Sequence, residues 1–421
     1  MIDRIIAAFK TAGIKEYRIT ETKKETAELF FVKKRLDMRR SNNCHSFDVT
    51  VFNRFEKNGK AMRGFTDIRV FPGTSEEELV KKLKDAYRAA GFVCNPVFEF
   101  PAPVQQKVTK ENPSLEEAVK VMSEALFASD TREDAFLNSA ELFINKSEVR
   151  IVTSEGTDVS FPRFYVKGEF VAQCKEPQDV ETYRDFAYKT LEKDELARLV
   201  ADVLEMTKAR AIAKEAPKAG KYRVIISGRY LKTIFEYYIG RSSSSYVYAK
   251  YSNYKVGDMV QGENISGEKL NITLKADDPF NSEGIPMKDR VLLKDGELQV
   301  IQGNARFAYY LGIEPTGAYD DIELAKGHTS LAEMKSQPYL HVVNFSDFQL
   351  DDFSGHFGGE IRLAFLFDGE KEIPVTGGSI SGNFIELQDN ICLSSELQKE
   401  NGYTGPLAIC FDSLNVAGKD E

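Results

Sequence analysis

Cysteine, histidine and tryptophan are scarce in this sequence of 421 residues, which has five cysteines, four histidines and no tryptophan. The cysteines are scattered and form no Cys-x-x-Cys pair; they are Cys44, Cys94, Cys174, Cys392 and Cys410. That spacing excludes a disulfide-rich secreted scaffold. It predicts reduced thiols and a cytoplasmic location.

Long apolar runs are also absent. No stretch approaches the ~18 consecutive apolar residues of a membrane-spanning helix, so we expect no membrane association. The first residues, MIDRIIAAFKTAG, place Ile2, Ile5, Ile6 and Phe9 on one helical face. We therefore expect an amphipathic helix there, and no signal peptide.

Basic charge is in deficit, because the formal net charge is -9 and the pI is about 5.4. This balance argues against general binding to nucleic acids or anionic membranes. Hydrophobic residues make up 42% of the chain and charged residues 29%, which is typical of a folded protein. Since 421 residues exceed what one hydrophobic core usually serves, we expect two or three domains.

The first half mixes predicted strands and helices. Helices are predicted over residues 74–90, with Thr74 as the cap, and from Pro113-Ser114 to about residue 129. Asn58-Gly59 and Glu155-Gly156 are predicted turns between strands. The strands themselves are expected at residues 16–22, 26–32, 46–55, 61–71, 140–145, 148–154, 157–162 and 165–172.

Residues 180–213 are predicted as one long helix, charged on its outer face. The segment Ala-Pro-Lys-Ala-Gly at residues 216–220 then marks a domain boundary. We predict an N-terminal domain at residues 1–215, with a further division into sub-regions 1–95 and 114–215. A C-terminal domain is predicted at residues 220–421.

The second half opens with a predicted strand at residues 222–227 and a helix at residues 229–239. Apolar side chains of that helix recur on one face at Leu231, Ile234, Phe235, Tyr238 and Ile239, so the helix should be buried. Beyond it, strands and turns alternate, with at most a short helix at residues 323–335. The predicted fold class is α+β: an α/β N-terminal half with a long helix, and a β-rich C-terminal domain around a buried helix.

An irregular acidic stretch, NITLKADDPFNSEGIPMKDRVLLKDGEL, spans residues 271–298. Its carboxylates Asp277, Asp278 and Glu283 could coordinate Ca²⁺ or Mg²⁺. The EF-hand spacing is missing, however, so turn chemistry and exposed charge are the favoured interpretation. The Asp-Gly pair near its end predicts a β-hairpin.

Four segments of the second half follow one another in the order known from one protein family. They are the acidic stretch, AYYLG followed by PTG at residues 308–317, FSGHFGGEIRLAFLFDGEKEIPV at residues 353–375, and GGSISGNFIELQDNI at residues 377–391. In this order they resemble the TldD/PmbA family of gyrase modulators and peptide-processing metalloproteases. The resemblance is weaker before about residue 220.

The resemblance implies two kinds of subunit. TldD-type chains carry His-Glu-x-x-x-His on the helix after the first strand of the C-terminal domain, and a later cysteine completes a zinc site. TldE/PmbA-type chains share the fold without these ligands. The present chain has Phe235-Glu236-Tyr237-Tyr238-Ile239-Gly240 on that helix, and none of its histidines lies between residues 46 and 327. No cofactor is therefore expected in this chain, and zinc is expected in a TldD-like partner.

Two histidines and a group of tyrosines are further candidates. His341 and His356 could bind a metal together with a cysteine, although a half-buried strand histidine is the simpler interpretation for His341. Tyr246, Tyr248 and Tyr251 follow a serine run and form either an exposed polar loop or a contact surface. Together with Asp277, Asp278, Glu283 and His356, they are the candidates for a peptide groove or an interface.

The resemblance implies a TldE/PmbA-like, non-catalytic subunit of a TldD/TldE-type metalloprotease acting in peptide processing. Its partners would be a peptide substrate and either a TldD-like chain or a second copy of itself. Two alternatives stay open. One is a self-sufficient metallopeptidase with an atypical metal site, and the other is a non-enzymatic protein that regulates DNA gyrase.

Overall fold

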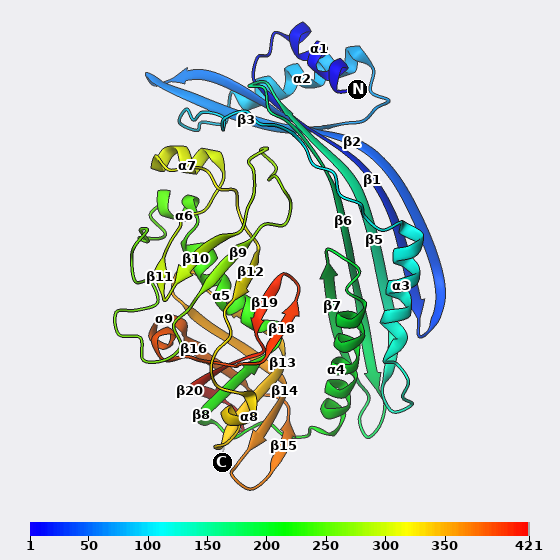
Figure 1. The fold of residues 1–421 in the computed structure, drawn as a ribbon, viewed down its shortest axis with the longest axis vertical. Coiled ribbons are helices and arrows are strands. Elements are labelled where there is room, and N and C mark those ends of the chain that lie inside the picture. The colour runs from blue at the N-terminus through cyan, green and yellow to red at the C-terminus, as the bar shows by residue number, and fades with distance from the viewer. Residues whose placement is uncertain (420–421) are drawn as a thin grey trace.

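The computed structural model describes residues 1–419 and has a mixed α+β architecture, as predicted (Figure 1). One long, strongly curved sheet dominates the N-terminal half, and two further sheets build the C-terminal half. The elements of the N-terminal half are α1 (Ile2–Ala12), β1 (Tyr17–Val32), β2 (Arg35–Lys57), β3 (Lys60–Val70), α2 (Glu76–Ala90), β4 (Gln105–Lys107), α3 (Leu115–Ala128), β5 (Phe136–Thr153), β6 (Asp158–Cys174), β7 (Val180–Tyr188) and α4 (Lys193–Ile212).

The first sheet has the strand order β3-β2-β1-β5-β6-β4, and β7 also pairs with β6. Because β1 pairs with β5 along most of its length, one sheet runs through both sub-regions of the predicted N-terminal domain. The two-residue turn between β2 and β3 contains Asn58 at φ 54° and Gly59 at φ 70°. These positive φ angles are those of a tight hairpin turn, so the predicted turn is confirmed.

One face of this sheet is covered by four helices. Side chains of α1 and α2 pack around Ile19 and Val49, and those of α3 and α4 pack around Leu29 and Leu142. Ile19 and Leu29 are both odd-numbered on β1, so they lie on the same face of the sheet. The opposite face is left for the C-terminal half, and Phe280 of that half packs there against Phe161 of β6.

The single helix predicted over residues 180–213 is wrong in its first part. Residues Val180–Tyr188 form β7, which pairs in antiparallel register with β6 from Val166 to Cys174. Only Lys193–Ile212 is helical, as α4. The sequence VETYRDFAY alternates buried and exposed side chains with the two-residue period of a strand. The helical pattern of residues 193–212 was extended too far toward the N-terminus in the prediction. Residues 180–188 instead pair with β6, a tertiary contact.

The C-terminal half places the predicted buried helix between two sheets. Leu231, Ile234 and Phe235 of α5 share one apolar core with Ile226 of the first of these sheets and Ile272 of the other. The sheets have the orders β13-β8-β20-β16-β14-β15 and β11-β10-β9-β12-β19-β18, and β17 pairs with β20. The elements are β8 (Gly220–Ser227), α5 (Tyr230–Arg241), α6 (Ser244–Tyr248), β9 (Ile272–Lys275), β10 (Arg290–Lys294), β11 (Glu297–Leu298), α7 (Ala305–Leu311), β12 (Asp321–Leu324), α8 (Leu331–Met334), β13 (Tyr339–Leu350), β14 (His356–Phe367), β15 (Glu372–Val375), β16 (Ser379–Asn383), α9 (Phe384–Leu387), the 3-10 helix η1 (Gln388–Asn390), β17 (Cys392–Leu393), β18 (Leu397–Glu400), β19 (Tyr403–Pro406) and β20 (Ala408–Ala417).

The predicted hairpin at the end of the acidic stretch is confirmed, since β10 and β11 pair across Asp295 and Gly296 at φ 52° and 85°. The short helix expected at residues 323–335 is reduced to α8, because residues 321–324 form strand β12. Within residues 1–419, no helix is both long enough and apolar enough to cross a membrane.

Candidate functional site

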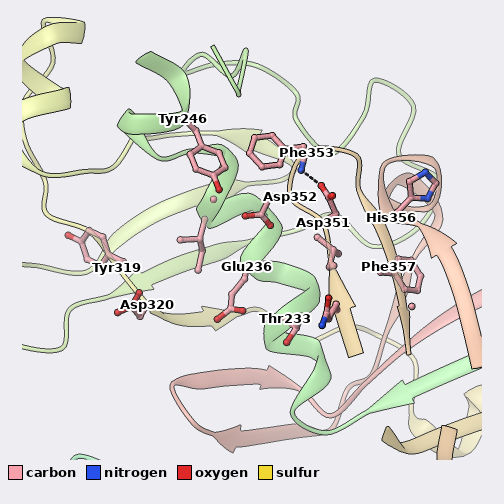
Figure 2. A pocket seen from close by; sticks show the side chains of 15 residues that line it. Thr233, Glu236, Tyr246, Tyr319, Asp320, Asp351, Asp352, Phe353, His356 and Phe357 are labelled. Carbon is pink, nitrogen blue, oxygen red and sulfur yellow. Dashed lines mark hydrogen bonds between the residues drawn. The ribbon is translucent and has the colours of Figure 1, made fainter. Parts of the chain in front are cut away.

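A cavity of about 800 Å³ lies along α5, on the side of the helix that faces the turn between β13 and β14 (Figure 2). Helix α5 contributes Thr233, Glu236 and Gly240, and the turn contributes Asp351 and Asp352. Aromatic side chains complete the walls; they are Tyr246, Tyr319, Phe353 and Phe357. The site therefore combines carboxylates with aromatic rings, a surface that suits a polar chain with some apolar side chains.

Two carboxyls of the cavity, those of Glu236 and Asp352, have raised pKa values. Burial raises the pKa of Glu236, Lys232 at 3.8 Å opposes this effect, and the charge of Asp320 adds to it. Burial also raises the pKa of Asp352, helped by the charges of Glu236 and Asp351. Figure 2 shows Glu236 and Asp352 next to one another along α5. Both carboxyls therefore hold protons to higher pH than ordinary carboxyls do.

The pKa of Asp351 is shifted in the opposite direction, because its carboxylate is hydrogen-bonded to the backbone of the turn. Its Oδ1 accepts hydrogen bonds from the backbone N–H groups of Phe353 at 2.7 Å and Ser354 at 3.0 Å. These bonds lower the pKa of Asp351. The turn thereby presents Asp352 toward α5 and leaves the Phe353 side chain 52% exposed.

Helix α5 does not offer the zinc ligands of a TldD-type chain. Phe235 stands at the first imidazole position and is fully buried, with its ring centroid 6.2 Å from that of Phe384. Gly240 stands at the second position, and a Cβ there would collide with the Asp352 carboxylate unless that side chain moved. Among residues 1–419, no three His, Cys, Asp or Glu side chains are grouped so that they could hold a metal ion. The residues present therefore do not fit a zinc ion.

The structure places His341 and His356 in different environments. His341 is buried on β13, and its Nε2 lies 2.8 Å from the Oγ of Ser227. Burial lowers the pKa of His341 to about 3, so the ring is neutral at physiological pH. His356 is exposed at the start of β14 and lines the cavity beside α5.

The predicted tyrosine group forms an aromatic surface next to this cavity. Tyr246 stacks on Phe353 with ring centroids 5.3 Å apart, and Tyr251 meets the same ring edge-on at 5.3 Å. Tyr248 of α6 contacts Tyr310 of α7, with the ring centroids 4.9 Å apart. Tyr248 and Tyr251 are 40% and 57% exposed, respectively. Exposed aromatic rings of this kind are typical of contact surfaces.

Three acidic residues of the stretch at 271–298 join the two halves of the molecule. Asp277 forms an ion pair with Lys189, and Asp278 forms one with Arg163. Glu283 lies 3.7 Å from Arg18 and also accepts a hydrogen bond of 2.8 Å from the backbone N–H of Ala305. Each cation belongs to the N-terminal half, so these carboxylates tie the acidic turns to the long sheet.

Two further cavities extend the first one along the face of the long sheet that is turned toward the C-terminal half. One, of about 570 Å³, shares Thr233 and Glu236 with it, and the other, of about 670 Å³, shares Asp320 with it. The two further cavities also share Lys167, Ala187 and Asn401 with each other. We call the three together the groove. Asp277 and Asp278 line its far part.

Several groove residues were not candidates in the sequence. Tyr183 donates a hydrogen bond of 2.8 Å to Glu169, and burial together with this bond raises its pKa to about 12. Asp185 pairs with Arg229 of the C-terminal half, and this pair lowers the pKa of Asp185 even though burial opposes the change. Both Tyr183 and Asp185 lie on β7, the segment predicted as helix. A strand reading of the alternating VETYRDFAY pattern would have placed them on one face.

The chain belongs to the PmbA/TldD family. The family model for the PmbA/TldA metallopeptidase central domain matches residues 109–216, and the model for the C-terminal domain matches residues 219–418. A relative named "Metalloprotease" from Methanothermobacter thermautotrophicus is 24% identical over 291 residues. That match spans 61% of this chain and 58% of the relative.

Three solved structures share the complete fold. A candidate modulator of a DNA gyrase from Thermotoga maritima has a TM-score of 0.77 at 19% identity, with 99% of each chain covered. TldE from Thermococcus kodakarensis has a TM-score of 0.77 at 16% identity, covering 99% of this chain and 100% of its own. A candidate modulator of DNA gyrase from Bacteroides thetaiotaomicron has a TM-score of 0.75 at 14% identity, with 99% of each chain covered.

Proposed function

We propose that this chain is a TldE/PmbA-like, non-catalytic subunit that works with a TldD-like zinc protease in peptide processing. The observation that carries the proposal is helix α5, which keeps Glu236 but has Phe235 and Gly240 where a zinc site needs imidazoles. In a TldD-type zinc site the glutamate takes a proton from a water molecule that the metal binds. Phe235 and Gly240 offer no imidazole to hold that metal beside Glu236, so in this proposal Glu236 binds the substrate.

The groove suits an extended peptide. It runs from the aromatic rings near Tyr246 past Glu236 to Lys189, and it carries both acidic and basic side chains. A peptide main chain offers donors and acceptors along its whole length, which charged and hydroxyl side chains can pair. In this proposal the present chain holds the substrate while the partner cleaves it.

The partner in this proposal is a TldD-like chain, or a second copy of the same chain, and the exposed aromatic surface around Tyr248 and Tyr251 is the candidate contact. The five cysteines are free thiols, which supports a cytoplasmic location. Zinc would be held by the TldD-like chain alone.

Two other functions are distinguished by the names of the similar proteins. The relative named a metalloprotease favours a self-sufficient peptidase, which in this chain would need an atypical metal site. The structures described as candidate gyrase modulators favour a non-enzymatic regulator of another protein. The ion pairs between the two halves and the groove are explained without either of these two functions.

The test measures metal content and peptidase activity of the purified chain, alone and mixed with a TldD-like chain. We expect no stoichiometric zinc, no cleavage alone, and cleavage in the mixture. Glu236→Gln should weaken peptide binding by the mixture, whereas the matched change Glu386→Gln, at an exposed position on α9, should not. Stoichiometric zinc lost on His341→Ala or His356→Ala would refute the proposal, and a stable gyrase complex without any TldD-like chain would support the regulator instead.

A further inference from the structure

Strand β2 has one long unpaired edge. It pairs with β1 from Arg35 to Val51, but β3 covers its other edge only from Phe47 to Lys57. Within residues 1–419, no strand or isolated bridge is formed on the outer edge between Arg35 and Ser46. In Figure 1 this part of β2 is the outermost strand of the long sheet, on the side away from the C-terminal half.

The backbone groups that point outward from this edge can be identified. Lys57 and Lys60 flank the two-residue turn, so odd-numbered residues of β2 bond to β3. The N–H of Phe52 accordingly points the other way and donates to the carbonyl of Glu16 at 3.1 Å. Continuing this alternation, Arg39, Ser41, Asn43 and His45 present unpaired N–H and C=O groups to the outside.

The side chains along the edge are basic and partly apolar. Residues 33–40, KKRLDMRR, contain five cations and one carboxylate in a chain of net charge -9. All residues from Lys33 to Asn43 are exposed. Val32, Leu36 and Met38 are 49%, 45% and 37% exposed, which is unusual for large apolar side chains beside an open edge.

We propose that the β2 edge from Arg35 to Ser46 docks an acidic, extended segment of another protein by adding it as a strand to the long sheet. Main-chain hydrogen bonds would provide affinity, and alternate side chains would provide selectivity. The cations along the edge favour a strand that carries acidic side chains. They also disfavour a second copy of this chain, because antiparallel pairing of two such edges would place like charges opposite one another.

This site is separate from the groove, since it lies at the outer strand of the sheet and shares no residue with the three groove cavities. It therefore stands whether or not the groove binds peptide. A polyanion would need only the charges, whereas an added strand also needs the outward N–H groups. That difference separates the two by experiment.

The test uses fluorescence anisotropy with a labelled synthetic peptide that alternates valine and glutamate. Asn43→Pro removes one outward N–H without touching the bonds to β1, and it should weaken binding about fivefold, the value of one typical hydrogen bond. Asn43→Ala is the matched control and should bind normally. Circular dichroism verifies that the proline variant is folded.

A second pair of variants tests charge. Arg35→Glu/Arg39→Glu should weaken binding of the same peptide by about tenfold or more at low salt. Lys84→Glu, a charge reversal at an exposed position on α2, should have no effect. The proposal is overturned if the glutamate peptide does not bind, or if a valine–lysine peptide binds equally well. It is also overturned if heparin, duplex DNA or anionic vesicles bind the edge and Asn43→Pro leaves peptide affinity unchanged, or if sedimentation shows self-association that the double reversal abolishes.

Discussion

The ion pair between Arg184 of β7 and Glu400 of β18 gives a sharp prediction about how the two halves are joined. Its atoms are 3.1 Å apart, and the side chains are only 6% and 12% exposed. The neighbouring residue Lys399 also reaches across to the N-terminal half, where it pairs with Glu192 at 2.6 Å, but these side chains are 51% and 26% exposed. Both pairs tie β18 to the N-terminal half, one at β7 and the other at the N-cap residue of α4, and they differ in burial.

Arg184→Met should destabilise the protein by about 3 kcal/mol, because it leaves the Glu400 carboxylate buried without its partner. Lys399→Met should cost ~1 kcal/mol or less, since water screens the exposed pair. The double variant Arg184→Met/Glu400→Met should recover most of the loss, because well-packed apolar side chains can replace a buried pair at little cost.

The assay is urea unfolding followed by circular dichroism and tyrosine fluorescence, since the chain has no tryptophan. A double-mutant cycle then isolates the coupling of Arg184 and Glu400. The reasoning from burial would be refuted if Arg184→Met cost no more than Lys399→Met. It would also be refuted if Arg184→Met/Glu400→Met lost as much stability as the single variants Arg184→Met and Glu400→Met lose together.

Three further predictions follow from buried or exposed groups. Burial lowers the pKa of His341 to about 3 in the folded state, so the free energy of unfolding should fall by up to ~1.4 kcal/mol per pH unit as the pH drops from the unfolded pKa near 6.5 toward 3. His341→Asn should remove this pH dependence when the free energy of unfolding is measured at pH 7 and pH 5. An unchanged dependence would contradict the assignment. Phe280→Ala should destabilise the contact between the halves by ~3 kcal/mol and speed proteolysis there, because Phe280 is buried against β5 and β6. Phe353→Ala, at an exposed position, should change stability by ~0.5 kcal/mol or less. Equal losses would show that Phe280 does not form a core between the two halves. Because burial raises the pKa of Glu236, carboxyl NMR should find this group titrating above the ordinary range for glutamate, and a normal titration would show that it is well solvated.

Features governed by local chemistry could be predicted from the sequence. The Asn-Gly and Asp-Gly turns were predicted correctly because only a few residues adopt positive φ without strain. The helix that became α5 was predicted because its apolar residues recur with the helical period. The absence of imidazoles from that helix is likewise a property of the sequence alone.

The N-terminal cap of α2 is a smaller correction. Thr74 was expected as the cap, but Ser75 accepts the hydrogen bond from the backbone N–H of Glu78 at 3.2 Å. Two adjacent hydroxyl residues are equivalent candidates in the sequence. The backbone path into the helix decides between them.

Contacts between distant residues were decided by the tertiary structure. Asp278 and Arg163 are 115 residues apart in the chain, so turn composition could suggest exposed charge but not an ion pair between the two halves. Residues 180–188 became a strand because β6 offered an edge to pair with. The open edge of β2 exists because β3 is shorter than β2. The sequence by itself determined the turns, the buried helix and the missing zinc ligands, which depend on neighbours along the chain; the groove, the interdomain ion pairs and the free edge depend on which strands and side chains the folded chain brings together.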